Sequence, residues 1–267
     1  DRAERTLDDL ERRLSAAPDA STQTLLASIA ADRASYAAMR GDVQLALQWA
    51  KPALAALATD EASGTAAAAS IALARFRPAS VLGLAHLRAG NVTEASRAFE
   101  LAISDAEQAG IPVAAGLLLC NLAQVRFVQG RLRSALAYCD RADQCAASST
   151  IPPTEGSNWG AGLVHSIRAE IAFERGRLDE AGSHARQAVV WMRQSRVTLG
   201  QETAYGLLAR IELARGQDEA AERALDRGLQ IAQGNDIPRL RSLSAAASRS
   251  QSNPRRGSAR CQGASPG

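Results

Sequence analysis

Residues 82–95 read LGLAHLRAGNVTEA, and this stretch decides the fold because its spacing recurs five times along the chain. Its centre is Gly90, with the small residue Gly83 seven positions earlier and Ala95 five positions later. Across the five copies, the central glycines are Gly41, Gly90, Gly130, Gly176 and Gly216, the earlier small residues are Ala34, Gly83, Ala123, Ala169 and Ala209, and the later alanines are Ala46, Ala95, Ala135, Ala181 and Ala221. The chain is therefore predicted to repeat one structural unit.

The spacing is typical of two antiparallel helices joined by a tight turn. Two helices that pack closely need small side chains where they cross, which explains the positions before and after the glycine. The glycine can end the first helix in a left-handed conformation without a Cβ clash. A bulkier apolar residue nine positions after it, such as Phe99, can then fill the groove. One such hairpin cannot bury its apolar face alone, so the copies must stack.

Composition agrees with a stack of helices outside a membrane. Of the 267 residues, 46% are hydrophobic but only 4% are aromatic, so alanine supplies much of the apolar surface and favours helix. No apolar run is long enough to span a membrane, and the charged N-terminus does not resemble a signal peptide. Three of the four cysteines, Cys120, Cys139 and Cys145, are predicted to be apolar packing residues on helices. These features predict a cytoplasmic protein.

The net charge of +3 is concentrated at the C-terminal end. Residues 241–267 contain five arginines and no acid, and the rest of the chain has 26 basic and 28 acidic residues. The helical part has no excess positive charge to attract a phosphate backbone, so no direct contact with nucleic acid is expected.

Two domains follow from these patterns: a helical repeat domain at residues 1–240, and a low-complexity basic tail at 241–267 that we expect to be disordered. Five complete hairpins are predicted, with partial ones at 1–16 and from Ile237 onward. Pro52 should kink or shorten its helix, and residues 60–80 should form either an extended helix or one that Pro78 interrupts or restarts. The chain begins in mid-repeat, which suggests a fragment. The tail either follows a lost reading frame or truncation near residue 245, or is an ordinary flexible terminus.

No catalytic, cofactor or metal motif is present. The single lysine, Lys51, precedes Pro52, which excludes a GxxxxGK[ST] phosphate loop. Gly160-Ala161-Gly162 has no preceding strand and is interpreted as a helix start. His86, His165 and His184 lack metal-ligand spacing and are expected to pack or lie on the surface. A non-enzymatic protein without a cofactor is predicted. A pocket that placed His165 or His184 beside a carboxylate with a perturbed pKa would instead favour an enzyme.

The five-fold pattern resembles the tetratricopeptide repeat (TPR), which implies an all-α, right-handed superhelix whose first helices line the concave side. Positions six and three residues before each glycine would then face the groove. The candidate binding residues are Ser35, Leu84, Gln124, Phe127, Glu170, Phe173 and Arg210. The alternative for Phe127 and Phe173 is packing between neighbouring repeats.

The phrases GLLARIELARG at 206–216 and RAEIAFERGRLDEA at 168–181 resemble the helical-repeat region of MalT-like, LuxR-family transcriptional regulators. That resemblance implies an effector-sensing and oligomerisation module of an ATP-dependent activator, whose ATPase and helix-turn-helix domains are not in this chain. The partner would be a protein, a peptide or a small effector in the groove, with self-association also open. The alternative is a stand-alone TPR scaffold or adaptor unrelated to transcription.

Overall fold

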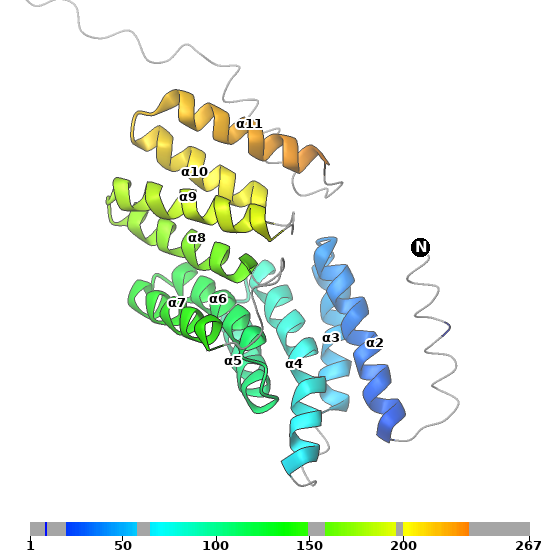
Figure 1. The fold of residues 1–267 in the computed structure, drawn as a ribbon. Coiled ribbons are helices and arrows are strands. Elements are labelled where there is room, and N and C mark those ends of the chain that lie inside the picture. Colours follow the sequence, from blue (N-terminus) through cyan, green and yellow to red (C-terminus); the bar gives the residue numbers. More distant parts are fainter. Residues whose placement is uncertain (1–8, 10–19, 58–64, 149–157, 196–199, 235–267) are drawn as a thin grey trace, which may run out of the picture.

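The computed structural model describes Asp9 and residues 20–57, 65–148, 158–195 and 200–234, and within these parts it contains ten helices and no strand. The helices form five consecutive pairs that stack along the chain (Figure 1). In chain order they are α2 (Ala20–Met39) and α3 (Val43–Ala56), α4 (Thr65–Arg88) and α5 (Val92–Gln108), α6 (Pro112–Val128) and α7 (Leu132–Ala147), α8 (Asn158–Glu174) and α9 (Leu178–Gln194), and α10 (Gln201–Ala214) and α11 (Asp218–Gly234). The predicted all-α class is confirmed.

Each predicted turn glycine ends the first helix of its pair. All five have a left-handed backbone, with φ between 70° and 81°. At Gly90 the amide donates to the carbonyl of Leu87 (3.1 Å), and the next amide, of Asn91, donates to His86 (2.9 Å). The other four turns repeat this pair of hydrogen bonds, which satisfies the last carbonyls of the first helix.

The small residues lie where the two helices of a pair cross. The alanines five positions after the glycine are buried, and four of the five have no exposed surface at all. At the position seven residues before the glycine, Gly83 lies against the ring of Phe99, which is itself fully buried. The predicted role of a bulkier residue nine positions after the glycine is confirmed in this pair.

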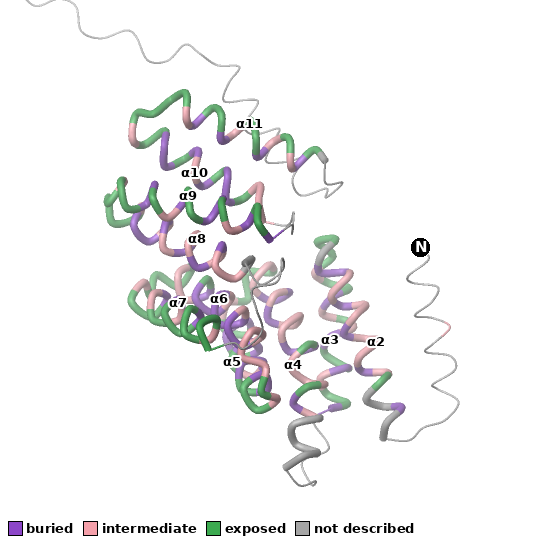
Figure 2. The backbone as a smooth tube through the Cα atoms, in the orientation of Figure 1, coloured by how far each residue is buried: buried purple, intermediate pink, exposed green. Residues whose placement is uncertain are grey.

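The stack has an inner and an outer side. Each first helix contacts the first helix of the next pair, whereas within the described residues no second helix contacts the next second helix. The first helices therefore lie on the inside of the curve and the second helices on the outside. Buried residues alternate with exposed ones along the helices (Figure 2), and the largest apolar cluster runs from α4 to α8.

Of the two alternatives for this region, the extended helix is observed from Thr65 onward, and the interruption at Pro78 is wrong. Helix α4 runs without a break for 24 residues and includes Pro78, whose side chain is fully buried. A proline costs a helix one hydrogen bond and a steric clash. Contacts of α4 with α2, α3 and α5 offset this cost. Helix α3 continues past Pro52 but is the shortest second helix, with 14 residues.

Other predictions fall outside the described residues. These are the partial repeats at 1–16 and after 237, and the basic tail at 241–267. Cys120 and Cys139 are buried and Cys145 is partly buried, as expected for packing residues, and all three are free thiols. Gly160 and Gly162 lie inside α8, as predicted. No helix in the described parts of the chain is long and apolar enough to cross a membrane.

Candidate functional site

The structure brings three of the seven candidate binding residues together on neighbouring first helices. Glu170 and Phe173 lie on α8, and Arg210 lies on α10. The Arg210 guanidinium carbon is 5.0 Å from the centroid of the Phe173 ring, and its Nη2 is 3.9 Å from Glu170 Oε1. We call Glu170, Phe173, Arg210 and the neighbouring Leu213 the α8–α10 patch.

The patch combines apolar and charged surface. Leu213 follows Arg210 by three residues on the same helix and exposes 62% of its surface. Arg210 is about half exposed, and a guanidinium over an aromatic face keeps its charge available while covering the ring. Burial raises the pKa of Glu170, and the nearby Arg210 opposes that shift. A ligand with an apolar group and a polar or charged end could contact this patch.

The remaining candidates do not join this patch. The Ser35 hydroxyl on α2 donates to the carbonyl of Ala31 in its own helix (2.8 Å). Gln124 is exposed on α6. Leu84 and Phe127 are half-buried and pack against the largest core cluster. These four side chains lie on the first helices α2, α4 and α6.

Packing between repeats accounts for part of the role of both phenylalanines. Phe127 packs against the central cluster, and Phe173 packs against a cluster that includes Leu207 and Ile211 of the next pair. Phe173 nevertheless forms the surface on which Arg210 stacks. Its ring therefore belongs both to the packing between pairs and to the α8–α10 patch.

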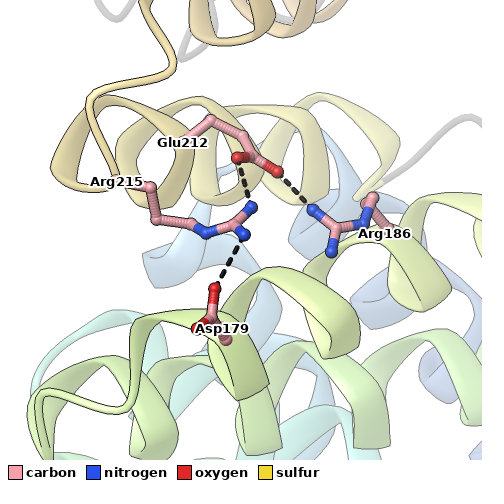
Figure 3. Close-up of polar contacts among 4 residues, drawn as sticks. All are labelled: Asp179, Arg186, Glu212 and Arg215. Carbon is pink, nitrogen blue, oxygen red and sulfur yellow. Dashed lines mark hydrogen bonds and ion pairs between the residues drawn. The ribbon is translucent and has the colours of Figure 1, made fainter.

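An ion-pair network joins the same two pairs of helices. The carboxylate of Glu212 on α10 is bonded to Arg186 of α9 and to Arg215, whose Nη1 is 2.8 Å away (Figure 3). Arg215 also binds Asp179 in the first turn of α9 at 2.8 Å. The whole of Glu212 is only 5% exposed. The network links α10, the helix that carries Arg210, to α9.

Gly182 lies beside this network. A Cβ at position 182 would lie 3.2 Å from Arg186 Nη1 and 3.3 Å from Arg215 Nη1. A side chain at this position would crowd the ends of both arginines, which would have to shift by a few tenths of an ångström. Sequence reasoning did not identify this network, because its four charged residues share no motif.

The structure also pairs two histidines that sequence reasoning treated separately. Nδ1 of His165 on α8 is 3.0 Å from Nδ1 of His184 on α9. The turn spacing could have revealed them. His165 lies eleven residues before Gly176 and His184 eight after it, about one helical turn beyond the small positions that face each other. Among the described residues, no group of three or more histidine, cysteine or acidic side chains could hold a metal ion.

Residues 27–257 match the family of MalT-like TPR regions, and this chain belongs to that family. The predicted family resemblance is thereby confirmed. The match continues past residue 240, into the segment predicted to be a tail. None of the curated proteins matches the chain.

Solved structures show the same fold at low sequence identity. BtubC from P. vanneervenii is 15% identical with a TM-score of 0.60, covering 98% of this chain and 94% of that one. The apo form of the quorum sensor NprR from B. thuringiensis is 12% identical with a TM-score of 0.63, covering 87% of this chain and 60% of NprR. Aspartyl phosphate phosphatase F from Bacillus subtilis is 15% identical with a TM-score of 0.59, covering 87% and 68%. At these identities the likeness concerns the fold alone.

Proposed function

We propose that this chain is a non-enzymatic recognition module whose first helices bind a peptide, a protein or a small effector, within a LuxR-family, MalT-like transcriptional regulator. The observation that carries the binding role is the α8–α10 patch. It places an exposed leucine and a stacked arginine side by side on the inner side of the curve. Binding surfaces commonly combine an apolar anchor with a few oriented polar groups.

The family supports the regulatory context of this proposal. Membership in the MalT-like TPR regions favours a module that couples ligand binding to a regulator. A quorum sensor, NprR, is built on a similar fold, which supports a sensing role by analogy. Cytoplasmic location and self-association in response to ligand belong to the same proposal.

A peptide selection tests the binding role. We would immobilise the chain and select a displayed random-peptide library, then measure the affinity of the selected peptides by fluorescence anisotropy. The variants Leu213→Asp and Arg210→Ala should each weaken binding about tenfold or more, as expected for central contact residues.

Matched controls lie on α9, on the outer side of the stack. Val190 is an exposed apolar residue and Arg193 an exposed arginine, so Val190→Asp and Arg193→Ala reproduce the same chemical changes away from the patch. Both should bind like the wild type. If the α9 variants weaken binding as much as the α10 variants, the α8–α10 patch is not the binding surface.

The competing function is a stand-alone scaffold, and the neighbouring coding sequence distinguishes it from the regulator. A P-loop ATPase encoded upstream and a helix-turn-helix domain encoded downstream in the same reading frame would support the regulator. Genomic sequence that joins these repeats to neither domain would support the scaffold instead.

A further inference from the structure

The two imidazole rings of His165 and His184 point toward each other across the α8–α9 hairpin. Their Nδ1 atoms are 3.0 Å apart, while the ring centroids are 5.2 Å apart and the ring planes are tilted by 42°. Each nitrogen lies on the edge of its ring. Because the two centroids are much farther apart than the two nitrogens, the rings meet edge to edge and do not stack. This is the geometry of one N–H···N hydrogen bond.

Such a bond depends on the protonation state of both rings. One Nδ1 must carry the hydrogen and the other must offer its lone pair. In a neutral pair, the two rings therefore have different tautomers. A doubly protonated pair has no acceptor, and it places two positive charges where the bond had been.

Charged groups from three elements face the pair. Arg168 of α8 lies near both histidines and binds Asp140 and Asp143 of α7, each at 2.8 Å. Near His184, Arg177 and Glu180 at the start of α9 bind each other at 2.8 Å.

These surroundings favour neutral rings. Burial lowers the pKa of His165 most, followed by His184 and Arg168, while Asp143 opposes the shift. Burial also lowers the pKa of His184 most, followed by Arg168, while Glu180 opposes the shift and Arg177 adds to it. Neither acid cancels the shift.

We propose that the His165–His184 hydrogen bond is a pH-sensitive latch that holds α8 against α9 near neutral pH and opens when both rings are protonated. The first proton from solvent leaves an N–H⁺···N bond in place. The second removes the acceptor, so the two rings must separate. Because the rings titrate as a coupled pair, the two proton-binding steps belong to the pair rather than to either histidine.

The latch bears on the candidate binding surface without depending on its function. His165 lies on the same helix as Glu170 and Phe173, two members of the α8–α10 patch. Separation of the two rings loosens the contact of α8 with α9 just before this part of α8. Acidification would therefore disturb the hairpin that supports the patch.

Nitrogen-15 NMR of the histidine rings tests the latch directly in the unaltered chain. At about pH 8, where model histidine side chains are neutral, we expect one ring of the pair to carry its hydrogen on Nδ1 and the other on Nε2. We also expect a scalar coupling between the two Nδ1 nuclei across the hydrogen bond. Two rings with the same Nε2–H tautomer and no coupling would overturn the proposal.

Variants test its energetic consequence. The His165→Gln/His184→Gln double variant lacks both titrating rings, and His86→Gln is the matched control on α4. Between about pH 7.5 and about pH 5.5, the double variant should lose the least stability, measured as the shift in urea midpoint, and the wild type the most. The His86→Gln control should fall between them, because it keeps the pair and lacks one titrating ring. Equal losses in all three proteins would overturn the latch. If the double variant does not fold, the coupling measured in the wild type decides.

Discussion

Phe99 and Gly83 lie against each other where the two helices of the second pair cross. A Cβ at position 83 would lie 2.7 Å from Cδ1 and Cε1 of the Phe99 ring. The ring is fully buried and cannot move aside cheaply. Gly83 is therefore required for packing and is not a source of flexibility.

The Gly83→Ala substitution should destabilise the chain. Overpacking of a close-packed site costs about 1–3 kcal/mol. Alanine gains only about 1 kcal/mol over glycine in a helix interior, so the net effect should be a loss. Urea denaturation followed by circular dichroism measures it. The control is Gly206→Ala in α10, where a Cβ would have no neighbour within 4 Å, and that variant should gain stability.

Ala135→Leu tests the alanine position that follows the turn. Ala135 has no exposed surface, and a leucine there should cost about 1–3 kcal/mol by overpacking. Ala137 is exposed on the same helix, so Ala137→Leu controls for the change in composition. A thermal melt of Ala135→Leu that matches the wild type would contradict the assigned register.

Glu212→Gln tests the ion-pair network between α9 and α10. The substitution preserves the shape of a buried side chain but removes the charge that binds Arg186 and Arg215. Hydrogen bonds to charged groups contribute about 1.5–3 kcal/mol, so a loss of that order is expected from chemical denaturation. The matched control is Glu219→Gln, which removes the partner of Arg223 in an exposed pair and should leave the melting temperature unchanged. An equal loss of stability in the two variants would contradict the stabilising role of the Glu212 network.

The free energy of unfolding should fall as the pH is lowered through about 6.5, the ordinary pKa of histidine. Burial is the first cause of a lowered pKa at His86, His165 and His184. The unfolded chain therefore binds protons at higher pH than the folded chain does, so stability is full above the ordinary pKa and is lost below it. Urea titrations at several pH values check this direction. Stability that rises on acidification from about pH 7.5 to about pH 5.5 would contradict it.

The turn positions could be predicted from sequence because each rests on a local constraint. A glycine in the left-handed region and an alanine at a helix crossing recur at the same spacing in every copy, as Gly130 and Ala135 do. The alternative of an interruption at Pro78 was wrong because the rule against proline in helices is local, whereas the contacts of α4 with its neighbours are tertiary.

The candidate site was less accessible from sequence for the same reason. Repeat offsets correctly placed Glu170, Phe173 and Arg210 on first helices, but the stacking of Arg210 on Phe173 depends on how two pairs pack. The Glu212 network and the His165–His184 contact also join residues from different helices. Only the histidines had a usable signal, their positions on either side of Gly176.

The central claim is that the first helices form the binding surface, and an NMR titration tests it most directly. The isotope-labelled chain would be titrated with a peptide selected against it, and the perturbed backbone amides would be mapped onto the helices. Our account predicts the largest perturbations at Glu170, Phe173, Arg210 and Leu213. Perturbations confined to the second helices α9 and α11 would contradict it.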